Sequence, residues 1–478
     1  MRMLRSWVVV LICIVCANSV SADAAKIQKI LQSSGYAAEK VGIYIKKLGS
    51  DAPVVSFNQD KKFNPASVMK LVTGAACFDL LGRDYRFETR VYLGGEFDRD
   101  SGVVKGDLYI VGGGDPGFTA EKLWLFSQNI RHMGIKKIEG DLVFDDSFFD
   151  TVGVGPGFSL DNSSRAYEAP VSALSASFNS VAVHVAPGAR PGSPVHIEPF
   201  PRIRDIPIIS TAKTQDASNS TPLQVRTEKV NGRTSIMVYG GMSVNDMPRY
   251  IYRKVWDTWQ NFGRVLWSHF EESGIVLDGS MRKEMVPAPA NNEGAFYVFK
   301  SDPLQTFVDA MYKYSSNFAA EMLFKTISAE KENMPGSWDR SAQLVGEWWK
   351  EQKLPDSVNV VNGSGMGNFN RVTPMQIGAL LEAVWTKKNY NLEYVNALSV
   401  AGVDGTLKSR FKYSPLKGML RAKTGTLNSY GVSTLAGFVF APGGTYVFAV
   451  FVNNGGAAQY NHWQLQRKIL EEFIPIKS

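Results

Sequence analysis

The chain has 478 residues, of which 44% are hydrophobic and 20% are charged, and its net charge is +7 at pH 7. This length is ample for a large buried core and for roughly three domains, which excludes a disulfide-stapled miniprotein and a disordered tail. A nucleic-acid-binding protein concentrates its positive charge, and no dense run of lysine and arginine stands out here. We therefore expect no nucleic-acid partner.

Residues 1–22 have the layout of a secretory signal peptide. Two arginines precede the apolar stretch Trp7–Ala17, and the small-residue site Val20-Ser21-Ala22 follows. About eleven apolar residues are too few to cross a hydrocarbon core of ~30 Å, so we expect cleavage after Ala22 and no transmembrane anchor afterwards. Of three cysteines, only Cys77 would remain, which excludes an intramolecular disulfide.

Beyond this segment, helix-rich regions flank a long stretch of short β-rich runs, from about Tyr92 to Pro289. Within that stretch, Gly112–Gly117 lacks the GxxxxGK[ST] spacing of a phosphate-binding loop and no clear helix is expected after it, so we interpret it as a turn. Thr373 is predicted to cap a helix that begins at Pro374. The other predicted elements, in chain order, are strands at Val41–Lys47 and Val54–Asn58, a helix at Ser67–Leu81, strands at Gly106–Val111, Lys137–Phe144 and Ser180–Val185, helices at Pro303–Ile327 and Trp338–Gln352, strands at Leu435–Phe440 and Thr445–Val452, and a helix at His462–Phe473.

The first chemical motif is Ser67-Val68-Met69-Lys70, an SxxK sequence at the start of a helix that is apolar nearly all round and hence buried. A spacing of three places Ser67 and Lys70 on one helical face, within reach of a direct hydrogen bond. A serine hydroxyl needs a base to become a good nucleophile, and a lysine in a dry site can lose its charge and act as that base. SxxK occurs six times in the chain, but only this copy opens a long apolar helix.

Two further motifs follow along the chain. Ser315-Ser316-Asn317 is an SxN sequence between two helical runs, and Lys423-Thr424-Gly425, followed by Thr426, is a KTG sequence that occurs once. A strand that displays a cationic side chain and a free edge can bind an extended peptide that ends in a carboxylate. SxxK, SxN and KTG in this order are the motif set of penicillin-recognising serine enzymes.

With these motifs, the sequence resembles the penicillin-binding D-alanyl-D-alanine carboxypeptidase/endopeptidase family of the class C, low-molecular-mass, penicillin-binding protein 4 type. A gap of 244 residues separates Lys70 from Ser315, and in this respect the sequence resembles the family, which inserts extra domains at that place. Similar blocks run along most of the chain, at Gly106–Tyr109, Gly114–Pro116, Tyr167–Leu174, Asn362–Gly365, Asn370–Pro374 and Leu435–Phe438.

The resemblance implies a role for each motif residue. Ser67 would be the nucleophile and Lys70 its base. Ser315 would pass a proton to the leaving nitrogen, and Asn317 would orient the substrate amide. Lys423 would supply positive charge toward Ser315 and the substrate carboxylate.

The resemblance also implies where substrate binds. Thr424, Gly425 and Thr426 would form a substrate-binding segment, in which the hydroxyls of Thr424 and Thr426 are candidates for holding the terminal carboxylate. Backbone N–H groups of Ser67 and Thr426 would form the oxyanion hole. Asp161-Asn162 stands where the family often has two acids, so Asp161 is a candidate contact for a cationic group on the peptide stem. A solvated loop acid is the plainer interpretation of Asp161.

The implied fold is α+β, with a β-lactamase/transpeptidase-like catalytic domain, an antiparallel sheet flanked by helices, assembled from both ends of the chain. One or two β-rich domains would be inserted between the SxxK and SxN motifs. The predicted boundaries are 1–22 for the signal peptide, 23–92 with 296–478 for the catalytic domain, 93–160 with 236–295 for an inserted β-rich domain, and 161–235 for a second, smaller one.

The expected function is that of a secreted serine D-Ala-D-Ala carboxypeptidase of the bacterial periplasm or cell-wall space, and of an endopeptidase where the acyl donor is a cross-link. Its partners would be peptidoglycan stem peptides, and β-lactam antibiotics as covalent inhibitors. No metal or cofactor is implied, because the five histidines lack metal-ligand spacing. Two alternatives stay open, a β-lactamase-like hydrolase and a catalytically idle wall-binding or penicillin-sensing protein. The long insert argues against the first, and the intact motif residues argue against the second.

Overall fold

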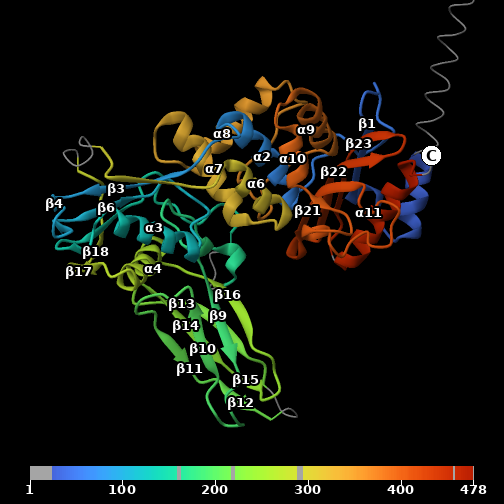
Figure 1. Cartoon of the computed structure of the whole chain (residues 1–478). Helices are drawn as coiled ribbons and strands as arrows, with labels where there is room; N and C mark the ends of the chain where they lie inside the picture. Colours follow the sequence, from blue (N-terminus) through green and yellow to red (C-terminus); the bar gives the residue numbers. More distant parts are fainter. Residues whose placement is uncertain (1–23, 159–162, 217–220, 288–293, 456–457, 477–478) are drawn as a thin grey trace, which may run out of the picture. The chain divides into compact units, whose positions relative to one another are not determined.

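The computed structural model describes residues 24–158, 163–216, 221–287, 294–455 and 458–476. Figure 1 shows the chain, which divides into two compact units. The predicted signal peptide and Asp161 lie outside the described residues, and the predicted domain boundaries stay predictions. Unit 1 consists of Met1–Arg83, Val308–Ser316 and Ala342–Ser478, and unit 2 consists of Asp84–Phe307 and Asn317–Ser341.

Unit 1 is built on a six-stranded sheet with the order β2-β1-β23-β22-β21-β20. All neighbouring strands in this sheet are antiparallel. Two strands come from the beginning of the chain and four from its end, as the interrupted catalytic region predicts. The strands are β1 (Val41–Lys47), β2 (Val55–Phe57), β20 (Ser399–Val400), β21 (Leu420–Leu427), β22 (Val432–Ala441) and β23 (Gly444–Asn453).

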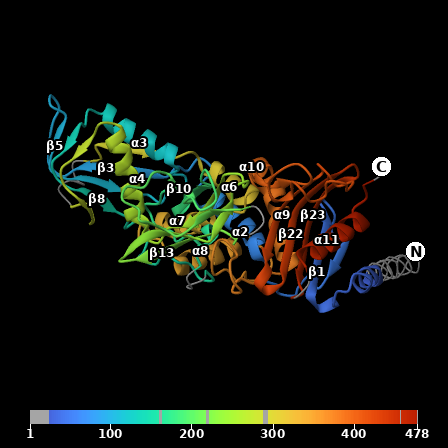
Figure 2. The ribbon, with the colours of Figure 1, turned by 90° about the horizontal axis from the view of Figure 1, so that it is seen from below.

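Helices cover both faces of this sheet (Figure 2). On one face, Leu470 and its apolar neighbours on α11 (Gln459–Phe473) join the strands in a buried cluster. On the other face, α9 (Pro374–Lys387) comes so close that a Cβ added to Gly378 would lie 2.3 Å from the ring of Tyr44. The remaining helices with residues in unit 1 are residues 24–33, α2 (Met69–Leu80), α6 (Leu304–Lys313), α8 (Trp338–Glu351) and α10 (Asn391–Ala397).

The turn that leads into α2 differs from the predicted continuous helix. It begins as a 3-10 turn, η2 (Ala66–Val68), and becomes α-helical only at Met69. The side chain of Asn64 accepts a hydrogen bond from the N–H of Ala66 at 2.9 Å, and Ala66 itself has a left-handed backbone with φ of +45°. A non-glycine residue in that region is strained, so the surrounding contacts must hold this turn in place.

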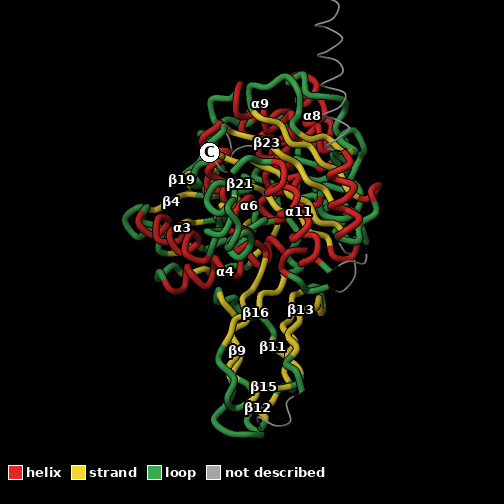
Figure 3. Tube along the Cα trace, turned by 90° about the vertical axis from the view of Figure 1, so that its right-hand side faces the viewer, coloured by secondary structure: helices red, strands yellow, loops and turns green. Residues whose placement is uncertain are grey.

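Unit 2 contains five sheets, with the orders β17-β7-β5-β4, β18-β8-β6-β3-β19, β10-β9-β16, β11-β14-β13 and β12-β15. The last three form a slender group of strands in Figures 1 and 3. The strands are β3 (Glu88–Leu93), β4 (Glu96–Asp98), β5 (Val103–Lys105), β6 (Leu108–Val111), β7 (Lys137–Ile138), β8 (Leu142–Asp145), β9 (Ser180–Ala186), β10 (His196–Phe200), β11 (Ile208–Ser210), β12 (Lys213–Gln215), β13 (Gln224–Val230), β14 (Arg233–Tyr239), β15 (Gly241–Ser243), β16 (Arg249–Lys254), β17 (Val276–Leu277), β18 (Met281–Lys283) and β19 (Tyr297–Lys300).

The described part of the β-rich insert contains two helices that the sequence pattern did not indicate, α3 (Ala120–His132) and α4 (Thr258–Glu272). The expectation that no helix follows Gly112–Gly117 was wrong, because α3 begins three residues later with Thr119 as its N-cap. Both helices place one apolar face in the core of unit 2. That face repeats at helical spacing, a pattern that the frequent glycine and proline around it obscured.

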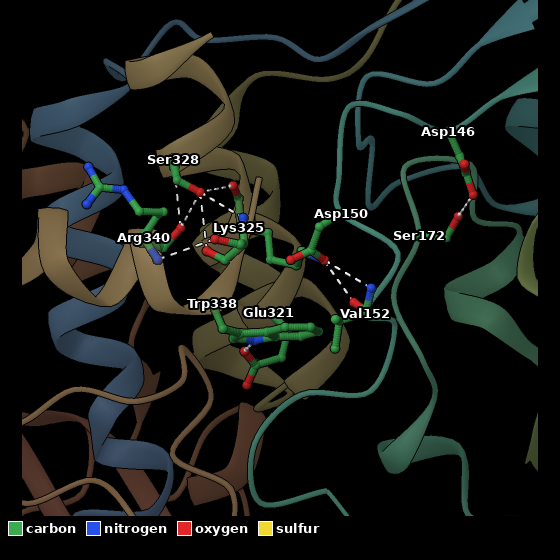
Figure 4. Close-up of polar contacts among 11 residues, drawn as sticks. Asp146, Asp150, Val152, Ser172, Glu321, Lys325, Ser328, Trp338 and Arg340 are labelled. Atoms are coloured by element: carbon green, nitrogen blue, oxygen red, sulfur yellow. Dashed lines mark hydrogen bonds and ion pairs between the residues drawn. The ribbon is translucent and has the colours of Figure 1, made fainter. Parts of the chain in front are cut away.

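The helix α7 (Asn317–Glu332) is anchored in unit 2 by a buried lysine (Figure 4). Nζ of Lys325 lies 2.6 Å from Oδ1 of Asp150 and 2.9 Å from the carbonyl oxygen of Val152. It also lies 4.3 Å from the ring centroid of Trp338. Burial lowers the pKa of Lys325 although Asp150 opposes that shift. The contacts fix the helix that begins with the last residue of the SxN motif.

Candidate active site

Ser67 and Lys70 form the hydrogen-bonded pair that their spacing predicts. Nζ of Lys70 lies 2.9 Å from Oγ of Ser67 and 2.8 Å from the carbonyl oxygen of Ser364. The lysine is completely buried in α2, whereas the serine is half-buried in η2, the turn before that helix. The pair therefore offers a hydroxyl that substrate can reach and an amine that is shielded from water.

A second lysine and serine pair lies in the same unit. Nζ of Lys423 on β21 lies 2.8 Å from Oγ of Ser315 and 2.8 Å from the carbonyl oxygen of Thr424. Ser315 follows the end of α6 and has a left-handed backbone with φ of +57°. Strain of this kind costs on the order of 1–3 kcal/mol and concentrates at functional sites.

The two lysines influence each other electrically. The pKa of Lys423 is held well below its usual range, mainly because the side chain is completely buried and also because Lys70 is a nearby positive charge. Two ammonium groups in one dry site repel each other, so the pair carries fewer protons than two separate lysines. A buried amine without its proton is what base-assisted activation of a serine requires.

The KTG strand passes very close to the turn that holds Ser67. A Cβ added to Gly425 would lie 2.1 Å from Oγ1 of Thr434 and 2.8 Å from the carbonyl oxygen of Pro65. The hydroxyl of Thr434 on β22 donates a hydrogen bond to that same oxygen at 2.6 Å. Only glycine fits at this position, and its absent side chain lets β21 run alongside η2.

The two threonines beside Gly425 differ in their surroundings. The hydroxyl of Thr424 is buried and donates to Oγ1 of Thr406 at 2.8 Å. Thr426 is exposed on β21. Thr426 is therefore the more accessible of the two hydroxyls predicted to bind a substrate carboxylate.

Four of the five motif residues therefore form two hydrogen-bonded pairs in unit 1, Ser67 with Lys70 and Ser315 with Lys423. Asn317 stands two residues after Ser315 and is the first residue of α7, in unit 2. Its side-chain amide donates a hydrogen bond to the carbonyl oxygen of Tyr167 at 3.2 Å.

Two contacts of the site were not predicted as such. Ser364 accepts the hydrogen bond from Lys70 through its backbone, and Thr406 accepts the hydrogen bond from Thr424. Ser364 lies inside a block that supported the resemblance, but a backbone acceptor leaves no side-chain signature. The neighbouring Gly365 is a visible sign of this contact in the sequence, because only glycine fits there. Its φ is +81°, and an added Cβ would lie 1.9 Å from the carbonyl oxygen of Ala66.

The geometry agrees with comparisons to known proteins. Residues 23–471 match the model of the D-Ala-D-Ala carboxypeptidase 3 (S13) family. The chain belongs to this family. It is 29% identical over 445 residues to the D-alanyl-D-alanine carboxypeptidase of Actinomadura sp. (strain R39), covering 90% of this chain and 80% of that protein. It is 26% identical to the D-alanyl-D-alanine carboxypeptidase DacB of Haemophilus influenzae, covering 86% and 85%.

Solved structures agree on the fold. Penicillin-binding protein 4 of Haemophilus influenzae superposes with a TM-score of 0.81 at 24% identity, covering 93% of this chain and 98% of that one. A predatory endopeptidase of Bdellovibrio bacteriovorus, acylated by penicillin G, has a TM-score of 0.51 at 18% identity, with 92% and 94% covered.

Membership of the S13 family confirms the predicted family and activity class, a serine-type D-Ala-D-Ala carboxypeptidase, and the structures confirm the α+β transpeptidase-like fold. No helix in the described part of the chain is long and apolar enough to cross a membrane.

Proposed function

We propose that this S13 carboxypeptidase releases the terminal D-alanine of peptidoglycan stem peptides through an acyl-enzyme on Ser67. The observation that carries the assignment is the 2.9 Å hydrogen bond between Ser67 and the completely buried Lys70. The neutral amine of Lys70 takes the proton of Oγ, and the oxygen attacks the carbonyl carbon between the two D-alanines.

The tetrahedral intermediate then breaks its C–N bond. Its oxyanion is held by backbone N–H groups of Ser67 and Thr426, on the two segments that Gly425 allows to run side by side. Ser315, hydrogen-bonded to Lys423, delivers its hydroxyl proton to the leaving amine of D-alanine and takes up the proton that Lys70 removed from Ser67, which leaves Lys70 neutral again. Water attacks the ester and gives a proton to Lys70. The bond between the acyl carbon and Oγ of Ser67 then breaks, Lys70 returns its proton to Oγ, and the shortened peptide leaves as a carboxylate.

The remaining predicted contacts complete this proposal. Asn317, at the start of α7, orients the amide of the substrate. Thr424 and Thr426 hold its terminal carboxylate, toward which Lys423 supplies positive charge when the single proton of the two lysines is on Lys423. Asp161 stays the candidate contact for a cationic stem side chain. The enzyme acts after export, in the periplasm or cell-wall space.

β-Lactams acylate the same serine in this proposal, because their strained amide presents a carbonyl and a carboxylate like those of the D-Ala-D-Ala end. Relatives of the same fold support this, one in complex with a β-lactam and one acylated by penicillin G. The same two steps cut a cross-link when the leaving amine belongs to a second stem, and a protein of the same fold is described as an endopeptidase.

Mass spectrometry of the intact protein tests the nucleophile. Benzylpenicillin should add one penicilloyl group to Ser67, and Ser67→Ala should abolish both the adduct and the release of D-alanine. The exposed SxxK sequence at Ser409 and Lys412 offers a matched control, so Ser409→Ala should change neither. An adduct on any other residue would overturn the assignment.

A second variant tests the base. Lys70→Arg keeps a positive charge but does not become neutral near pH 7, so acylation should slow at least ~10²-fold. The control Lys412→Arg should acylate at the wild-type rate. Fast turnover of a chromogenic β-lactam, instead of a burst followed by a slow phase, would favour the β-lactamase-like alternative. Absence of D-alanine release would favour the catalytically idle alternative, a penicillin-sensing protein if the adduct still forms and a wall-binding protein if it does not.

A further inference from the structure

Three side chains of unit 2 bring metal-ligand atoms together on β9 and β10. They are His184 on β9, and His196 and Glu198 on β10. One ring nitrogen from each histidine and one carboxylate oxygen of the glutamate all lie within 4.8 Å of one another. Nε2 of His196 is 3.8 Å from Oε2 of Glu198.

The register of the two strands creates this cluster. Glu198 stands directly opposite His184 in the antiparallel pair, and His196 is two residues from Glu198 on the same strand. Side chains alternate between the faces of a sheet, so all three share one face. The intervening residues, such as Val183 and Val185, point to the other face and belong to the buried core of unit 2.

The neighbouring strand restrains one ligand of the cluster. Tyr250 on β16 stands opposite His184 on its other side, and the two ring centroids are 4.9 Å apart. His184 is half-buried beneath this contact, whereas His196 and Glu198 are exposed. The cluster thus has a fixed imidazole on the central strand and two adjustable ligands on the edge strand.

We propose that His184, His196 and Glu198 form a binding site for a divalent transition-metal ion, for which Zn²⁺ is the natural probe. In a tetrahedral site with bonds of ~2.0–2.1 Å, two ligand atoms lie about 3.3 Å apart. The three ligand atoms here lie within 4.8 Å of one another, so side-chain rotation brings them to that separation. Imidazole nitrogen excludes Ca²⁺ and Mg²⁺, which take oxygen ligands.

The three ligands leave one coordination position open to solvent. The bound ion links the edge strand β10 to the central strand β9, across the connection formed by residues 187–195. It therefore stabilises this sheet and presents a Lewis-acidic position at its outer surface. The sequence alone could not indicate such a site, because the strand register and not a spacing motif brings the three residues together.

Metal titration of the full chain, without an added histidine tag, tests the proposal. Zn²⁺ in competition with a chromophoric chelator should give one ion per chain, and Co²⁺ should give the visible absorption of a tetrahedral nitrogen and oxygen site. His184→Ala and Glu198→Gln should each weaken binding at least about tenfold.

The exposed His132 of α3 provides the matched control, and His132→Ala should bind Zn²⁺ as tightly as the wild type. Circular dichroism and thermal unfolding of the full chain report that every variant is folded, and acylation of Ser67 by penicillin in unit 1 should not change. The proposal is overturned if no ion binds, or if His132→Ala lowers the affinity as much as His184→Ala does.

Discussion

Replacing Gly425 by alanine tests whether the close approach of β21 to η2 sets the position of the serine. The new Cβ would lie 2.1 Å from Oγ1 of Thr434, and real Cβ atoms essentially never have contacts shorter than 3.0 Å. Thr434 must therefore retreat, which breaks its 2.6 Å hydrogen bond to Pro65. The carbonyl of Pro65 and the Cβ of Ala66 are also at 2.8 and 3.0 Å from the added atom, so the turn before Ser67 is displaced too.

The expected magnitudes follow from this crowding. Overpacking of a tight site lowers the free energy of unfolding by ~1–3 kcal/mol. A shift of reacting groups by about 1 Å can slow a reaction by ~10²-fold, so acylation by a fluorescent penicillin should slow by that order in Gly425→Ala. Thermal unfolding and the time course of labelling measure the two effects on the same preparation.

Gly346 provides a matched control, because it lies on α8 with no atom within 4 Å of its added Cβ. Gly346→Ala should raise the stability by up to ~1 kcal/mol, since alanine favours the helix, and should acylate normally. If Gly425→Ala is folded and destabilised but acylates at the wild-type rate, β21 does not set the position of Ser67.

Three further predictions concern buried charges. Burial raises the pKa of Asp115 to about 7, so the folded protein takes up a proton there, and the stability that this proton contributes is lost as pH rises from about 4 through 7. At pH 8, Asp115→Asn should therefore be more stable than the wild type by up to ~4 kcal/mol. Equal melting temperatures of the two proteins at pH 8 would contradict this. Because burial lowers the pKa of Lys423, folding releases a proton from this lysine. The stability of the wild type should therefore rise relative to that of Lys423→Met between about pH 7 and 10. A difference in melting temperature that stays constant over this range would refute the prediction. Lys325→Met should lower the free energy of unfolding by ~3–5 kcal/mol, because Asp150 loses its buried partner. A double-mutant cycle with Asp150→Asn should give a coupling energy above ~0.5 kcal/mol. Additive losses in the cycle would show that the two side chains do not stabilise each other.

The chemistry of unit 1 could be predicted from the sequence because it rests on local spacing. Ser67 and Lys70 are one helical turn apart, and the order of the three motifs limits the alternatives. Strand β1 and the capped start of α9 were predicted for the same reason, since Thr373 and Gln376 form a capping box within four residues. Local patterns of this kind do not depend on the rest of the fold.

Other features depend on contacts between distant residues and left no local pattern. The 3-10 turn at Ser67 is imposed by Asn64 and by the strand that carries Gly425, although the sequence favours a regular helix there. Ser315 has a left-handed backbone for which serine has no preference, and its side chain bonds to Lys423, 108 residues later in the chain. Tertiary contacts overrode local propensity at both places.

The order of strands in unit 1 has a consequence for the synthesis of the enzyme. Val41 of β1 pairs with Val452 of β23, so the catalytic sheet cannot close before almost the whole chain has been made. At ~5–20 residues per second, a ribosome needs on the order of 20–80 s between these two strands. During that interval β1 has no partner for one of its edges, which under the proposed export keeps the chain unfolded for passage across a membrane. A chain that stops before β23 has the proposed nucleophile and both lysines but lacks the strand between β1 and β22, so premature termination should yield no active hydrolase.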